Sequence, residues 1–149
     1  MGIEENIEAN KDVVRRFVDE CVNTHREDLL PRFVDDGVTM YPGTPGQAEA
    51  THGIEELRSA FRRFRVLFPD LHVTPEMLLG EGEYVVARWT GTGNQAAEVS
   101  GVAPSGQALT WGGIDIYRIQ DGRIVEWWRN DDFVWLLHQL GRDLIPAGG

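Results

Sequence analysis

The chain has 149 residues, of which 42% are hydrophobic and 26% are charged, and it contains a single cysteine, Cys21. This length and composition are typical of one globular domain that buries enough apolar surface to fold without cross-links. One cysteine cannot form an internal disulfide, and no Cys/His pair has the spacing of zinc ligands. The sequence therefore excludes a disulfide scaffold and a structural zinc module, and we predict no metal site.

The charge balance is acidic, with 14 lysine and arginine residues against 24 aspartate and glutamate residues and a formal net charge of −10. The basic residues are scattered rather than gathered into a stripe, which argues against nucleic acid as a partner. The first residues are acidic and lack the basic end and apolar run of a signal peptide. No apolar stretch has the length that a bilayer requires. We expect a cytoplasmic protein without a membrane partner.

The first half of the chain has helical periodicity. Apolar residues recur at steps of three and four from 7 to 22, which predicts an amphipathic helix. A short second helix is expected over 26–33, and the acidic residues and glycine at 35–37 suggest a turn. After a loop rich in proline and glycine, a third amphipathic helix begins at Ile54 and ends at Pro69.

The second half alternates with the period of strands. Asp121 and Gly122 separate two strand-like runs and give a strong hairpin signal. A short closing helix is expected, with Asp132 at its N-cap position and Gly141 past its end. Helices followed by consecutive strands predict an α+β fold, with helices on one face of a strongly bent antiparallel sheet and a cavity between them. The predicted strands cover 38–41, 71–79, 84–92, 108–119 and 123–130.

Three parts of the chain resemble the SnoaL-like polyketide cyclase branch of the nuclear-transport-factor-2-like superfamily. Together they cover most of residues 11–141. The matching segments are 53–71, then 81–90 with 101–106, and finally 110–119 with 121–128 and the tail 132–141.

The resemblance implies a single domain over 1–149 with its core at about 8–141. Its expected form is a cone-shaped, curved antiparallel sheet with three N-terminal helices packed over it and a short C-terminal helix. It further implies a homodimer formed through the sheet, no cofactor, and acid/base chemistry on a small apolar polyketide or terpenoid in a deep pocket. Fold-level analogy alone does not give the reaction.

The chain departs from the family pattern at the positions that usually carry polar groups. The run that supplies a histidine and a carboxylate in the last strand corresponds here to residues 126–129, Glu-Trp-Trp-Arg. A histidine common in an earlier strand is replaced by Gln95, and a His/Asp pair before the first loop is replaced by Met40 and Tyr41. The general bases of ketosteroid isomerase and limonene epoxide hydrolase are therefore missing.

Asp115 is the strongest candidate for chemistry because it lies between two isoleucines on a strand of aromatic and small residues. A buried carboxyl holds its proton and can act as a general acid. We assign Arg129 as a group that stabilises an anion and Asp131 as the remaining proton acceptor. A structural ion pair of Asp115 with Arg129 or Arg88 is the alternative.

An aromatic lining suits a flat apolar ligand. The leading hypothesis is a cofactor-independent cyclase or isomerase, with an epoxide hydrolase or epoxide-opening cyclase and a non-catalytic ligand-binding protein as alternatives. Asp132 is also expected to cap the last helix. The residues predicted to contact the substrate are Phe17, Tyr41, His52, Arg88, Gln95, Trp111, Tyr117, Trp127 and Asp132.

Overall fold

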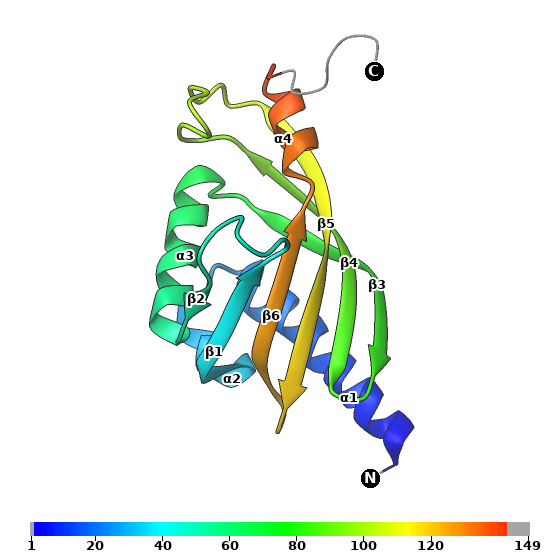
Figure 1. Cartoon of the computed structure of the whole chain (residues 1–149). Helices are drawn as coiled ribbons and strands as arrows, with labels where there is room; N and C mark the ends of the chain where they lie inside the picture. The colour runs from blue at the N-terminus through cyan, green and yellow to red at the C-terminus, as the bar shows by residue number, and fades with distance from the viewer. Residues whose placement is uncertain (1, 143–149) are drawn as a thin grey trace.

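The computed structural model describes residues 2–142. Its helical segments are α1 (Ile3–Arg16), continued by a π-helix (Phe17–Val22), a 3₁₀ turn (Glu27–Leu29), α2 (Leu30–Phe33), α3 (Ile54–Leu67) and α4 (Phe133–Gln139). Its strands are β1 (Val34–Pro42), β2 (Thr51–His52), β3 (His72–Glu81), β4 (Tyr84–Asn94), β5 (Ala108–Gln120) and β6 (Arg123–Asp131). The α+β class predicted from the sequence is confirmed (Figure 1).

The six strands form one mixed sheet in the order β2-β1-β6-β5-β4-β3. The prediction of an antiparallel sheet is wrong at one pairing, because β1 runs parallel to β6, with Met40 opposite Trp127. A parallel pair needs a long connection. Here that connection contains α3 and the strands β3, β4 and β5.

Two local predictions have opposite outcomes. Asp121 and Gly122 have φ angles of 51° and 76°, the two positive values of a type I′ hairpin turn, as predicted. The turn expected at 35–37 is wrong, because these residues belong to β1. The pairing of β1 with β6 is irregular between Val34 and Thr39, so the three residues lie in an uneven part of a strand. Only a local bond from the Gly37 N–H to the Asp35 carboxylate, 2.9 Å, resembles a turn.

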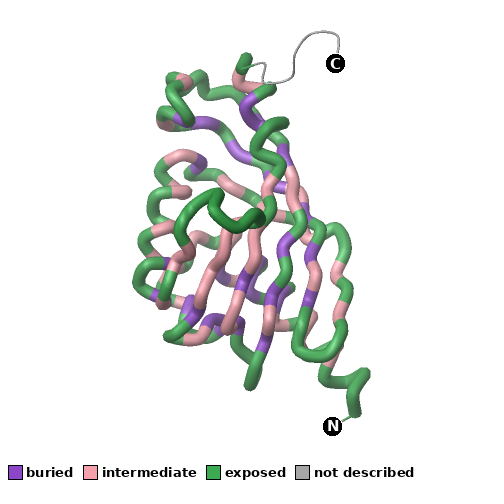
Figure 2. The backbone as a smooth tube through the Cα atoms, in the orientation of Figure 1, coloured by how far each residue is buried: buried purple, intermediate pink, exposed green. Residues whose placement is uncertain are grey.

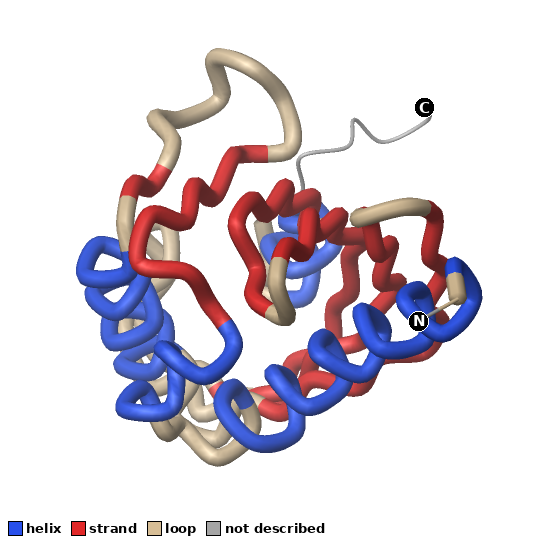
Figure 3. The backbone as a smooth tube through the Cα atoms, turned by 90° about the horizontal axis from the view of Figure 1, so that it is seen from below, coloured by secondary structure: helices blue, strands red, loops and turns tan. Residues whose placement is uncertain are grey.

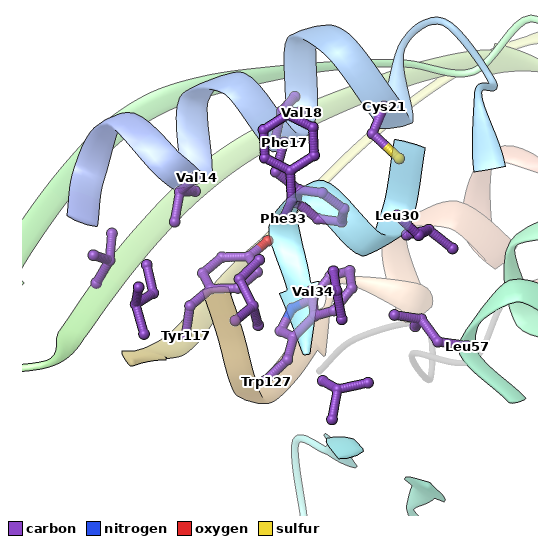
Figure 4. Packing of buried hydrophobic residues seen from close by; sticks show 14 of the residues in the cluster. Val14, Phe17, Val18, Cys21, Leu30, Phe33, Val34, Leu57, Tyr117 and Trp127 are labelled. Atoms are coloured by element: carbon purple, nitrogen blue, oxygen red, sulfur yellow. The ribbon is translucent and has the colours of Figure 1, made fainter. Parts of the chain in front are cut away.

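One face of the sheet is covered by helices, and the other is open. Buried residues recur at every second position along β4 and β5, as the purple bands of Figure 2 show. Seen from below, the strands follow a curve that α1 and α3 border (Figure 3). Against this face, Phe17 packs edge-on to Trp127 at 5.7 Å between ring centroids, and Trp127 stacks on Tyr117 at 5.1 Å (Figure 4). No helix within residues 2–142 is long and apolar enough to cross a membrane.

The inner face of the sheet carries small residues where a cavity can form. Ala87, Gly91 and Gly113 lie on the same face as the large Trp89 and Trp111. The two glycines leave room for the tryptophan rings, since a Cβ would lie 2.8 Å from Trp89 at Gly113 and 3.1 Å from Trp89 at Gly91. The small Ala87 is itself part of the cavity wall.

Candidate active site

A cavity of about 420 Å³ lies between the helices and the inner face of the sheet. A volume of this size suits a small organic ligand. Its wall is mainly apolar, with Val14, Phe17 and Val18 on one side and Phe61 and Phe64 on another. On the sheet side it is lined by Ala87, Trp89, Trp111, Asp115, Tyr117, Trp127 and Arg129.

Asp115 lies in the sheet wall of this cavity and is 3% exposed. Its Oδ2 accepts hydrogen bonds from Trp127 Nε1 at 2.9 Å and from the Tyr117 hydroxyl at 3.4 Å. Its Oδ1 is buried and has no hydrogen-bond partner. One oxygen is thus held by two hydrogen bonds, and the other is buried without one.

Burial raises the pKa of Asp115, while the Arg129 charge acts to lower it and the Asp131 charge to raise it. Burial and the neighbouring Asp115 also raise the pKa of Tyr117 well above its ordinary value, so its hydroxyl keeps its proton. Because Oδ2 already accepts two hydrogen bonds, a proton on the carboxyl belongs on Oδ1. The geometry therefore places a carboxyl with a raised pKa in the wall of the cavity.

Arg129 binds Asp131 rather than Asp115. Its Nη2 lies 2.8 Å from Asp131 Oδ2, and its guanidinium lies 5.5 Å from the centre of the Trp127 ring. Within residues 2–142, Asp115 forms no ion pair with Arg129 or Arg88, so the structural alternative for Asp115 is not observed. The guanidinium attracts Asp115 electrostatically from the opposite position on the next strand.

Trp89 is a cavity residue that the sequence analysis did not assign to the site. Its indole Nε1 is buried without a hydrogen-bond partner. The indole lies next to Asp115 and acts as a hydrogen-bonding neighbour that lowers the pKa of this carboxyl. The ring is seated on Gly113, where an added Cβ would be 2.8 Å from Trp89 Cζ2. Strand alternation with the buried Val85 and Ala87 is the signal that could have identified it.

Four of the predicted contact residues line the cavity, namely Phe17, Trp111, Tyr117 and Trp127. Asp131 is placed beside them by its bond to Arg129. Two of the three predicted catalytic residues, Asp115 and Arg129, thus line the cavity with these four aromatic side chains, and Asp131 is bonded to Arg129.

Two of the remaining predicted contact residues lie on the outer face of the sheet. Tyr41 donates a hydrogen bond from its hydroxyl to Glu126 Oε2 at 3.0 Å and stacks on Trp128. Arg88 is exposed because it alternates with the inward Ala87 and Trp89. Neither residue lines the cavity, which corrects their assignment.

Three other residues predicted to contact the substrate lie outside the cavity wall, which corrects their assignment. Gln95 is buried, but its amide holds the loop after β4 by donating to the carbonyls of Ala97 and Val102. His52 is exposed on β2. Asp132 caps α4 by accepting from the Trp135 N–H at 3.1 Å. These residues stabilise local structure away from the cavity wall.

His25 and Glu27 also line the cavity. His25 has a φ of 56°, and its carbonyl accepts from Arg65. Glu27 is paired with Arg62 at 3.0 Å and with Arg65 at 2.6 Å. This conformation could not be inferred from periodicity because it follows the π-helix, where helical spacing is interrupted.

Cys21 is the remaining reactive side chain in the wall. Burial raises the pKa of its thiol to about 12, with smaller contributions from Asp28 and Glu27. The thiol is therefore protonated at neutral pH and is a poor nucleophile. Among residues 2–142, no three His, Cys, Asp or Glu side chains converge as metal ligands.

Comparison with known proteins places this site in a family context. The model of the family described as SnoaL-like polyketide cyclase matches residues 12–140. No curated protein matches the chain.

Solved structures resemble the chain over nearly its whole length. A protein from Jannaschia sp. CCS1, described as a SnoaL-like polyketide cyclase, is 25% identical with a TM-score of 0.78, covering 94% of this chain and 95% of its own. IdmH of Streptomyces antibioticus, described as a polyketide cyclase, is 28% identical with a TM-score of 0.76. The match covers 89% of this chain and 99% of IdmH. TsrD of Streptomyces laurentii is 29% identical with a TM-score of 0.75, and the match covers 90% of this chain and 96% of TsrD.

Proposed function

The chain belongs to the SnoaL-like polyketide cyclase family, and on this premise we propose that it is a cofactor-independent cyclase or isomerase. Its substrate would be a small apolar polyketide or terpenoid intermediate with a carbonyl or a related oxygen. The observation that carries the proposal is Asp115, a buried carboxyl in an aromatic cavity with one oxygen held and the other unpartnered. Such a carboxyl suits acid/base chemistry on a bound carbonyl.

Asp115 is the general acid in this proposal. The N–H of Trp127 and the hydroxyl of Tyr117 fix Oδ2, so the carboxyl cannot rotate without losing both hydrogen bonds. The proton on Oδ1 then faces a ligand in the cavity. As a carbon–hydrogen bond next to the ligand carbonyl breaks, Asp115 gives its proton to the developing enolate oxygen.

Arg129 stabilises the negative charge that develops on the ligand. Its charge lies beside Asp115 on the neighbouring strand, and its Nε has no hydrogen-bond partner. When Arg129 binds an oxygen of the ligand, its ion pair with Asp131 weakens. Asp131 then accepts the proton that leaves the ligand carbon. The acid and the base thus come from two adjacent strands.

Opening an epoxide by water would need a second carboxylate that is free to activate the water. The other carboxylates at the cavity are ion-paired, Asp131 with Arg129 and Glu27 with Arg62 and Arg65. Because the proposed carbonyl chemistry also releases Asp131 from Arg129, this pairing does not separate the two reactions. The following experiment distinguishes catalysis from ligand binding without turnover.

The test measures exchange of the hydrogens next to the carbonyl of 2-tetralone in deuterated buffer, followed by NMR, together with turnover of aromatic polyketide methyl esters by mass spectrometry. We expect wild-type protein to exceed the buffer rate and Asp115→Asn to lose about 100- to 10,000-fold. Trp128→Phe, on the outer face, is the matched control and keeps the wild-type rate. Wild-type rates equal to buffer on every compound would make the protein a binding protein instead.

A further inference from the structure

Charged side chains line the cavity at two places. One is the sheet wall, with Asp115 and Arg129. The other is formed by α3 and by the segment after the π-helix, and its charged or titratable members, which we call the rim, are His25, Glu27, Arg63 and Arg65. Of the residues in 2–142 that line the cavity, Arg63 alone is exposed. The cavity therefore opens to water at the rim.

The rim carries more positive than negative charge. Glu27 is shared by two arginines, with Oε2 at 3.0 Å from Arg62 Nε and Oε1 at 2.6 Å from Arg65 Nη2. Arg63 lies between these two arginines in the sequence, and its side chain forms no ion pair or hydrogen bond within residues 2–142. One guanidinium is thus left without a counter-charge at the opening, although the whole chain has a net charge of −10.

Arg63 lies in the row of α3 that faces the cavity. Residues three or four positions apart are neighbours on one side of a helix. Ala60, Arg63 and Leu67 form such a row, and all three line the cavity. Arg62, one position earlier, is exposed and lies outside the cavity wall. A charge that required only water would suit the position of Arg62, whereas Arg63 interrupts an apolar row beside an apolar cavity.

The chemistry of a free guanidinium at an apolar opening selects a ligand group. A guanidinium binds the planar carboxylate through two parallel hydrogen bonds, and the single charges of the two groups match. A carboxylate at the exposed Arg63 stays in contact with water, so it avoids the cost of burying a charge. The apolar remainder of the same molecule can fill the cavity, which Phe61, Phe64 and Trp111 line.

We propose that the ligand of this cavity is an apolar molecule with a terminal carboxylate, which Arg63 binds at the rim. Arg65 holds the rim in place, because its two terminal nitrogens bind the His25 carbonyl at 3.0 Å and the Glu27 carboxylate. The inference rests on the proposed function for the opposite, reacting end of the ligand at Asp115. It names the substrate as an organic acid that enters with its carboxylate outward.

The experiment measures dissociation constants by calorimetry for 4-(2-naphthyl)butanoate and 4-(2-naphthyl)butanamide, which share ring, length and shape and differ in charge. We expect wild-type protein to bind the acid about fivefold more tightly than the amide, the effect of a well-formed ion pair that water reaches. Arg63→Met should remove this preference and leave the affinity for the amide unchanged, and Arg63→Lys should retain part of it. A wild-type protein that binds the acid no more tightly than the amide would overturn the proposal.

Two further variants, checked for native circular dichroism, locate the carboxylate. Arg32→Met is the matched control, because Arg32 is an exposed arginine of α2 outside the cavity wall, and it should keep the wild-type preference. Loss of the preference in Arg32→Met would assign it to the charge of the whole protein and overturn the proposal. Arg129→Met should also keep the preference. Loss in Arg129→Met with retention in Arg63→Met would place the carboxylate at the sheet wall, which contradicts binding at the rim.

Salt gives a second measurement on the wild-type protein. An ion pair that water reaches is screened by salt, so the preference for the acid should shrink in 1 M sodium chloride. A preference that salt leaves unchanged would contradict binding at the exposed rim. Because these experiments measure binding alone, a protein that prefers the acid through Arg63 without exchanging 2-tetralone would refute the proposed function and not this inference. Exchange of 2-tetralone without a preference for the acid would refute only this inference.

Discussion

The two faces of the same sheet treat polar groups in opposite ways. On the outer face, Glu126 is fully engaged, with one oxygen bound to Arg118 and the other to Tyr41, and Arg118 also reaches Glu83 at 3.3 Å. On the inner face, Asp115 and Arg129 keep unpartnered atoms, although burial there makes an unmade hydrogen bond costlier. Of these groups, Asp115 is the most buried, at 3% exposure, and one of its oxygens has no hydrogen-bond partner. The proposed function assigns this open oxygen of the inner face to chemistry on a ligand.

The largest expected difference between the faces concerns apolar packing, and the same substitution can be made on each. Leu109 is 1% exposed on the inner side, and Leu79 is 56% exposed on β3. Leu109→Ala should lower the free energy of unfolding by about 2–5 kcal/mol because it leaves a cavity. Leu79→Ala should cost less than about 1 kcal/mol. Urea unfolding followed by circular dichroism measures both, and equal costs would contradict the division into faces.

The outer face also carries the prediction of a homodimer, which the family resemblance implies. Ile114 and Met77 are about half exposed there, at 53% and 50%. Pairing of two copies would remove such apolar surface from water. We expect a dimer in sedimentation at micromolar concentration and a monomer for Ile114→Asp with unchanged circular dichroism. A wild-type protein that sediments only as a 16.8 kDa species would remove the idea.

On the inner face, Asp115 should make stability depend on pH. Its pKa is raised in the folded state, mainly by burial, so the folded protein holds this proton more tightly than the unfolded chain. The stability it contributes is present below the unfolded pKa and is lost as the pH rises through the folded pKa. Asp115→Asn should therefore melt a few degrees above wild type at pH 8, with a smaller difference at pH 4. A difference that grows on acidification would contradict the raised pKa.

The smallest effect is expected for the exposed ion pairs. Arg118→Met removes the bonds to Glu126 and Glu83. Partly exposed ion pairs contribute at most about 1 kcal/mol, and salt screens them. The change in unfolding free energy should stay below that value and shrink further in 1 M salt. A larger loss of unfolding free energy that does not depend on salt would show that these ion pairs stabilise the sheet more than exposed pairs do.

Hydrophobic periodicity predicted the helices and strands in which apolar residues recur regularly. It was wrong where a local turn signal competes with pairing to a strand that is distant in the sequence. The helix ending before Pro69 and the strands from β3 to β6 were found with small shifts at their ends. The acidic residues at 35–37 form part of β1 because β6 pairs with that strand from far along the chain. Local sequence carries no information about such a partner.

The candidate site shows the same difference between local signals, which the sequence reveals, and distant neighbours, which it does not. Asp115, Trp127 and Tyr117 were predicted because an aspartate between apolar neighbours on a strand is visible in the sequence. Arg88 and Tyr41 were misassigned because family correspondence was followed at positions where strand alternation places the side chain on the other face. Trp89 was overlooked because its role depends on Gly113, a residue on another strand.

The π-helix over Phe17–Val22 has a consequence for how this protein can diversify. Its backbone bonds skip one residue more than an α-helix, as from the Asn23 N–H to the Val18 carbonyl at 2.9 Å. Deleting one residue there would restore the α-helical spacing and would change only the side chains of this wide turn, because the turn already holds one residue more than an α-helical one. The helical wall of the cavity would be remodelled while the side chains that line it from the sheet stay in place. The shape of the cavity and the polar groups of its sheet wall can thus be changed separately.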